Sequence, residues 1–172
     1  MTQDARLREA ADRSEIAQVL YKLARGLDRL EPETLRAVFA EGAHVELGVF
    51  HAGDADGFVK VAMDFMGSME RTQHTIGNIL VELSGDVAAA ESHVHAHHVL
   101  RTDEGPQELV VGARYLTRLR RGGEGWHISH HTEVMDWGVM RPLGPWFDDN
   151  RELPKGARKS DDLSATLFGD AR

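Results

Sequence analysis

The sequence predicts a single α+β domain, in which three helices pack on a curled antiparallel or mixed sheet. Three stretches with apolar residues at helical spacing come first, and four strand-like stretches with short, turn-rich connections follow. Helices followed by a run of strands are typical of an α+β domain, and a helix-covered concave sheet leaves a pocket between its layers. We expect the domain to span residues 1–138, and residues 139–172 to form a tail that packs on the domain or on a partner subunit.

The first helix is expected over residues 12–30. Asp12, followed by Glu15, resembles a capping box with an acidic residue in the Ser/Thr place. Apolar residues recur at helical spacing and make one stripe, which predicts a helix that buries one face. The stripe consists of Ile16, Val19, Leu20, Leu23, Ala24 and Leu27.

Two shorter helices flank a turn-rich stretch. Pro32 suits the first turn of a second helix, which we expect over residues 33–42 with Gly42 at its end. Residues 43–53 alternate around glycines, which indicates strand and turn. A third helix is expected over residues 55–69, where the apolar residues again recur at helical spacing.

The second half of the chain is strand-like. The strands are expected over residues 74–83, 87–100, 108–121 and 125–137. Their connections, SGD, TDEGPQ and GGEG, are short and rich in turn formers, so the strands should form an antiparallel meander.

Composition excludes several classes of function. Hydrophobic residues make up 41% and charged residues 28% of the 172, which is ordinary for a globular protein. Cysteine is absent, so disulfides, thiolate metal sites and cysteine nucleophiles are absent too. The net charge of −8 disfavours nucleic acid as a partner, and no apolar run is long enough to cross a membrane. We therefore expect a cytoplasmic protein.

Asp28 is the first candidate for chemistry. It lies at the flank of the apolar stripe of the first helix, near the same helical angle as Tyr21, so both side chains can face a pocket. The alternative is that Asp28 merely ends the helix, or pairs with Arg25 or Arg29. A carboxylate near a helix C-terminus is electrostatically disfavoured, an inconsistency of the kind that function can explain.

His74 is the second candidate, at the start of the first long strand. A histidine at a strand end is more often structural than catalytic. A carboxylate that orients and charges an imidazole makes a competent general base near neutral pH, so His74 becomes a catalytic candidate if it contacts Asp28.

Four histidines fall in the stretch 91-ESHVHAHHVL-100. Side chains alternate across a strand, so His93, His95 and His97 share one face and His98 lies on the other. Same-face neighbours stand ~6.5–7 Å apart at the Cα, close enough to share a metal, and a His-x-His-x-His metal site is one hypothesis. The face around His98 is small and apolar, so we expect His98 in the pocket and the other three on the outer face, where a second subunit can contact them.

Further pocket residues are expected on the third helix and the last strand. His130 and His131 point to opposite faces, and we place His131 inward. On the neighbouring strand it stays open whether Arg114 or Tyr115 faces the pocket. The apolar face of the third helix contributes two expected wall residues, Phe58 and Met66.

Three segments of the chain resemble one known family. They are 15-EIAQVLYKLARGLDRLEPETLRAVFAEGAHVEL-47, 72-TQHTIGNILVELSGDVAAAESHVHAHH-98 and 112-GARYLTRLRRGGEGWHISHH-131. They resemble the SnoaL-like branch of the NTF2-like superfamily, which includes scytalone dehydratase-like proteins and hexachlorocyclohexane dehydrochlorinase. The resemblance covers about residues 10–137. It is specific for a fold and not for one reaction, because the superfamily mixes enzymes with binding modules.

The resemblance implies a cone-shaped α+β (cystatin-like) barrel with a deep pocket and a metal-free, cofactor-free lyase site. Asp28 and His74 fall on the positions of the orienting aspartate and the basic histidine, and His98 resembles the second pocket histidine. Tyr21 is a pocket donor by this comparison, although the dehydratases carry their tyrosine immediately before the aspartate, where this chain has Leu27.

Two functions follow from the resemblance and the candidate residues. The first is a cofactor-independent lyase or isomerase of aromatic compound metabolism, acting on a hydrophobic aromatic or polycyclic small molecule. His74 would be the base, and His98, together with Tyr21 or His131, would be the acid or oxyanion donor. The alternative is a non-catalytic binding or interaction module, such as a dioxygenase small subunit. Family members pair through the outer sheet face, so a homodimer or homotrimer is expected.

Overall fold

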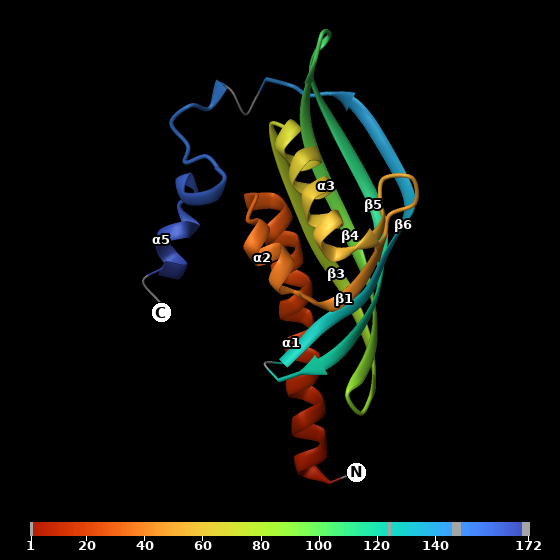
Figure 1. The fold of residues 1–172 in the computed structure, drawn as a ribbon. Coiled ribbons are helices and arrows are strands. Elements are labelled where there is room, and N and C mark those ends of the chain that lie inside the picture. The colour runs from red at the N-terminus through yellow and green to blue at the C-terminus, as the bar shows by residue number, and fades with distance from the viewer. Residues whose placement is uncertain (1, 124, 146–148, 170–172) are drawn as a thin grey trace.

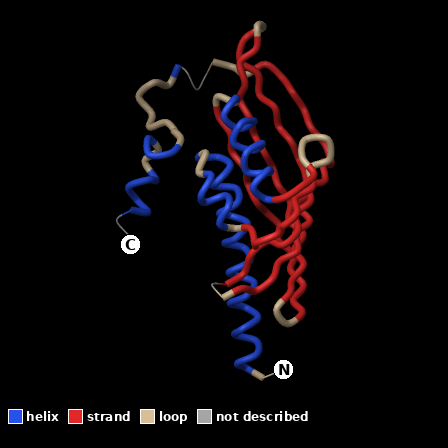
Figure 2. Tube along the Cα trace, in the orientation of Figure 1, coloured by secondary structure: helices blue, strands red, loops and turns tan. Residues whose placement is uncertain are grey.

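The computed structural model describes residues 2–123, 125–145 and 149–169, and it confirms the α+β class. Helices form one layer and strands the other, as the colours of Figure 2 show. The helices are α1 (Gln3–Arg29), α2 (Pro32–Ala37), α3 (Ala55–Ser68), the short α5 (Ser164–Gly169) and one 3-10 turn, η1 (Lys159–Asp161). The strands are β1 (Phe39–Glu46), β2 (Ala52–Asp54), β3 (Arg71–Ser84), β4 (Val87–Thr102), β5 (Gly105–Gly122) and β6 (Gly125–Pro142).

The described strands form one mixed, curled and open sheet in the order β2-β1-β6-β5-β4-β3. β3 to β6 pair antiparallel in sequence order, which confirms the meander. β1 returns parallel to β6, and β2 pairs antiparallel with β1. α1 contacts β3 and β6, while α3 lies near β1 and β2, so the helices cover one face of the sheet (Figure 1). Among the described residues, no helix is long and apolar enough to cross a membrane.

The expected start of the first helix is wrong. α1 begins at Gln3, and the hydroxyl of Thr2 accepts a hydrogen bond from a first-turn N–H. Asp12 and Glu15 lie inside the helix and bind Trp126 instead: Asp12 accepts from its indole N–H at 3.1 Å, and Glu15 accepts from its backbone N–H at 2.8 Å. The acidic pair therefore attaches α1 to the start of β6 and does not cap a helix.

The second helix is also shorter than expected. α2 ends at Ala37, and β1 begins at Phe39, so the end at Gly42 is wrong. Phe39 is buried and packs edge-on against Phe58 of α3, with ring centroids 5.6 Å apart. Gly42 has a φ of +69° at the irregular register between β1 and β6, a backbone conformation that glycine adopts freely. Burial of this segment in the sheet thus overrides its helical pattern.

The core lies between α1 and the sheet. The apolar stripe of α1 is buried, as expected, and most of it belongs to one core cluster with buried residues of β1 and of β3 to β6. Gly26 allows α2 to approach, because a Cβ there would lie 2.8 Å from the Cβ of Leu35. This close contact fixes the last turns of α1 against α2.

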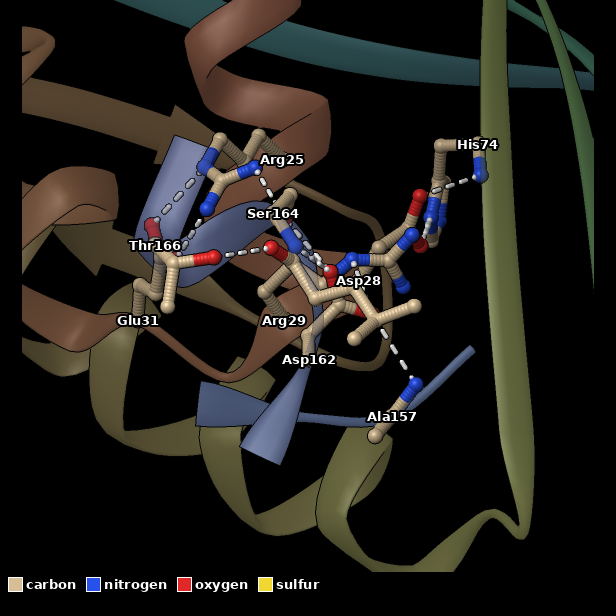
Figure 3. A network of polar contacts seen from close by, with 10 residues as sticks. Arg25, Asp28, Arg29, Glu31, His74, Ala157, Asp162, Ser164 and Thr166 are labelled. Atoms are coloured by element: carbon tan, nitrogen blue, oxygen red, sulfur yellow. Dashed lines mark hydrogen bonds and ion pairs between the residues drawn. The ribbon is translucent and has the colours of Figure 1, made fainter. Parts of the chain in front are cut away.

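The chain beyond the sheet returns to the last turn of α1 (Figures 1 and 3). β6 continues past the expected domain boundary to Pro142. In the returning segment, the carboxylate of Asp162 lies 3.5 Å from the guanidinium of Arg29, and Arg25 donates a hydrogen bond of 3.1 Å to the hydroxyl of Ser164. Arg158 donates to the carbonyl of Met66 at 2.7 Å. The tail therefore packs on α1 and α3.

Asp162 organises this segment, and its replacement should release it. Hydrogen bonds from Ser164 and from the N–H of Ala157, with the charge of Arg29, hold the pKa of Asp162 well below its usual range. Loss of these charge-assisted bonds in Asp162→Ala should speed amide exchange of residues 157–167 by about tenfold or more, measured by hydrogen–deuterium exchange. The matched control is Asp161→Ala, at an exposed neighbour. Equal exchange in the two variants would show that Asp162 does not hold the tail.

Candidate active site

The centre of the candidate site is a contact between Asp28 and His74. The ring Nδ1 of His74 donates to Asp28 Oδ1 at 2.7 Å, and its backbone N–H donates to Oδ2 at 2.8 Å (Figure 3). Both side chains are almost fully buried. Because a carboxylate can only accept, Nδ1 carries the proton and Nε2 is left as the basic nitrogen. The contact expected from the sequence is present, and neither Arg25 nor Arg29 replaces His74 as the hydrogen-bond partner.

Burial and hydrogen bonding act in opposite directions on Asp28. Burial disfavours its charged form, but the hydrogen bonds and charge of His74 outweigh that penalty and lower the pKa of Asp28 below its ordinary value. Asp28 is therefore ionised at neutral pH, even though it lies in the last turn of α1, where the helix dipole disfavours a negative charge.

His74 lines a cavity of about 370 Å³ between the helices and the sheet. Most of its wall is apolar: Leu23 and Leu27 of α1, Phe58, Phe65 and Met66 of α3, and Val111 of β5. The expected wall residues Phe58 and Met66 are in place. The polar groups that reach the cavity come from β3 to β6, and they are His74, His98, Tyr115, His131 and Glu133.

His98 faces the cavity, as strand alternation predicts. It is buried, while His93 and His95 are exposed on the outer face. Its ring centroid lies 5.3 Å from that of His74. Burial, with the charge of His74, lowers the pKa of His98 to about 4, so its ring is neutral at pH 7. Its Nδ1 is buried without a hydrogen-bond partner among the described residues.

His131 also faces inward, and His130 lies outside against His44. The Nδ1 of His131 shares a hydrogen bond of 3.0 Å with the hydroxyl of Thr117. Burial, with the neighbouring charge of His130, lowers the pKa of His131 to about 4. The ring of Tyr115 packs edge-on against His131 at 4.7 Å, which settles the open question for that strand: Tyr115 lies in the pocket and Arg114 outside, where it binds Asp136.

Glu133 is a pocket residue that the sequence analysis missed. It pairs with Tyr115 across β5 and β6, and it lines the cavity with His131 and Met135. A signal was present, because the alternation that turns His131 inward also turns Glu133 inward, two positions on.

The expectation that Tyr21 lies in the pocket is wrong. Its side chain is 45% exposed and does not line the cavity. Tyr21 and Asp28 share a helical angle, but two turns, about 10 Å of helix axis, separate them. Side chains also lean toward the helix N-terminus, which moves Tyr21 further from the pocket.

The histidines of the outer face do not gather into one cluster. His97 binds Glu108 at 2.9 Å, and His95 packs against Trp137 with ring centroids 5.9 Å apart. Within the described ranges, no group of three or more His, Cys, Asp or Glu side chains could hold a metal ion. The outer run therefore serves separate contacts.

A family model for SnoaL-like domains matches residues 8–132, and solved structures share the fold. A type 2 hexachlorocyclohexane dehydrochlorinase (LinA) is 20% identical with a TM-score of 0.71, over 79% of this chain and 93% of that one. A protein of Novosphingobium aromaticivorans assigned as a scytalone dehydratase is 21% identical with a TM-score of 0.69, over 83% and 94% of the two chains.

An NTF2-like protein with a cystatin-like fold, also from Novosphingobium aromaticivorans, is 21% identical with a TM-score of 0.62, over 77% of this chain and 87% of that one. No curated protein matches the chain. The similarities establish the cystatin-like fold, which proteins named as a dehydrochlorinase and as a scytalone dehydratase share.

The neutral buried histidines should make stability depend on pH. His131 has a pKa of about 4 in the folded protein and about 6.5 as its ordinary value, so between these two pH values the unfolded chain binds more protons. The free energy of unfolding should fall as the pH is lowered through this window, by at most roughly 1.4 kcal/mol per pH unit for this group. The free energy of unfolding of His131→Asn, measured with urea, should depend less on pH than that of the wild type. The exposed His95→Asn is the control, and equal slopes for wild type and His131→Asn would contradict the assignment.

Proposed function

The chain belongs to the SnoaL-like domain family, and we propose that it is a cofactor-independent lyase that eliminates a small group from a hydrophobic, aromatic or polycyclic molecule. The observation that supports this most directly is the Asp28–His74 hydrogen bond of 2.7 Å at the wall of an open, largely apolar cavity. A binding module needs no such buried acid–base pair beside its ligand. A double-bond isomerisation would begin with the same proton abstraction and is the second choice.

In the proposed reaction, His74 Nε2 removes a proton from a carbon next to an electron-withdrawing group. Asp28 holds the ring in the Nδ1–H form and stabilises the imidazolium that results, because its carboxylate stays ionised. Such a base typically contributes roughly 10²–10⁴-fold to the rate. No step needs a metal or an organic cofactor.

The remaining polar groups orient the substrate. His98 and His131 are neutral at pH 7, because the pKa of each is about 4, so they offer hydrogen bonds and not mobile protons. The ring of His98 lines the cavity beside the ring of His74, with centroids 5.3 Å apart, where it suits contact with an oxygen of the bound molecule. Phe58, Phe65 and Met66 suit a flat apolar body.

Removal of either member of the pair should slow elimination strongly. The probe is the β-hydroxy ketone whose dehydration gives benzylideneacetone, followed by the ultraviolet absorbance of the conjugated product. His74→Ala and Asp28→Asn should each lower kcat/KM by roughly 10²-fold or more, because one loses the base and the other its orientation and charge.

The control for this experiment is His95→Ala, which removes an exposed histidine of the outer face. It should keep wild-type activity, and far-ultraviolet circular dichroism should show all the variants folded. Near-full activity in His74→Ala or Asp28→Asn would rule out the proposed mechanism.

A further inference from the structure

Glu133 contributes a carboxyl group to the cavity wall, and this group has no role in the proton abstraction by His74. It is partly buried, it lines the cavity with His74, and it lies opposite Tyr115 on the neighbouring strand. Its carboxyl group has no hydrogen bond or ion pair with any residue that the structure describes. A carboxyl group in such a place is available to a bound molecule.

The surroundings of Glu133 favour its protonated form. Burial raises the pKa of Glu133, and the charge of His74 opposes this effect only in part. The titratable groups that line the same cavity are His74 on β3, His98 on β4, Tyr115 on β5 and His131 on β6, with Asp28 of α1 behind His74. The described residues of α3 on the cavity wall are all apolar.

The other groups of the cavity are poor proton donors. His98 and His131 are neutral imidazoles at pH 7, since each has a pKa of about 4. The pKa of Tyr115 is raised by burial and by the charges of Glu133 and Asp28, so its phenol holds its proton firmly. Among the described residues that line the cavity, none is Lys or Arg. A departing hydroxyl needs a proton, which the protonated form of Glu133 can give, whereas a halide leaves as an anion and needs none.

We propose that Glu133 is the general acid of the site, and that the substrates are β-hydroxy carbonyl compounds with an aromatic or apolar body. This assignment rests on the proposed lyase function. In the step, His74 Nε2 takes the proton of the carbon next to the carbonyl, and the electrons of that C–H bond form the C=C bond. The C–O bond breaks with its electron pair, the oxygen takes the proton of Glu133, and water leaves. Transfer of the proton of the His74 imidazolium to the Glu133 carboxylate through solvent then restores both groups.

A pair of probes with a common product tests the role of Glu133. The β-hydroxy ketone and the β-chloro ketone both give benzylideneacetone, but chloride leaves without a proton. Glu133→Gln should lower kcat for the hydroxy ketone by roughly 10²-fold or more and change elimination of chloride only a few-fold. His74→Ala should lower both, and Glu104→Gln, at an exposed turn residue, should lower neither.

The outcomes separate this role from the lyase function itself. An equal loss for both ketones in Glu133→Gln, or no loss for either, would overturn the acid role while leaving the base in place. Absence of enzyme-dependent elimination from both ketones in the wild type would count against the lyase function, and against this role with it.

A readout that needs no turnover completes the test. Carbon-13 NMR of the glutamate carboxyl groups should show one signal that titrates at higher pH than the others and disappears in Glu133→Gln. A titration of Glu133 in the range of the exposed glutamates would overturn the proposal.

Discussion

The buried charge of Asp28 is the constraint on which the site depends. Its carboxylate lies in the last turn of α1, at the negative end of the helix dipole and away from water, and both factors disfavour ionisation. His74 offsets them by giving both its backbone N–H and its ring N–H to the two carboxylate oxygens. Because the backbone takes part, the interaction fixes the start of β3 against the end of α1 as well as the side-chain orientation. Neighbouring contacts hold the same turn: α2 packs on Gly26, and the tail binds Arg25 and Arg29.

Besides this contact, the alternation of side chains along the strands determines which of the remaining polar groups face the cavity and which lie on the outer face. His98, Tyr115, His131 and Glu133 come from three adjacent strands and point to the covered face. Outer-face positions of the same strands carry charged or exposed groups, such as His95 and Arg114. The inner histidines are neutral because burial lowers their pKa values. A cavity that is apolar in bulk thus contains one histidine held by a buried carboxylate and several neutral hydrogen-bonding groups, an arrangement suited to binding and deprotonating an uncharged molecule.

The spacing of residues in the sequence predicted most of the fold and most of the pocket residues. It failed where contacts between distant parts of the chain determine the structure. A period of two placed His98 inside and His93 outside, and a period of 3.6 placed the buried stripe of α1. The start of α1 was missed because Asp12 and Glu15, read as a local cap, bind Trp126 more than a hundred positions away. Tyr21 was misplaced because an angular argument ignores distance along the helix axis. Glu133 was missed although the alternation that turns His131 inward also turns Glu133 inward, because only His131 was considered as a pocket residue on that strand.

Charge conservation connects the Asp28–His74 pair to the proposed acid. In the proposed resting state, with His74 as the base and Glu133 as the acid, the carboxylate of Asp28 carries the one negative charge of the three groups. After elimination the three groups are two carboxylates and one imidazolium, which is again one negative charge. The proton therefore crosses the pocket without adding net charge to a medium of low polarity, where an isolated new charge would be costly. A base without an opposing acid would leave a hydroxide ion in the same space. The separation of His74 and Glu133 onto different strands that line one cavity lets a single bound molecule contact both.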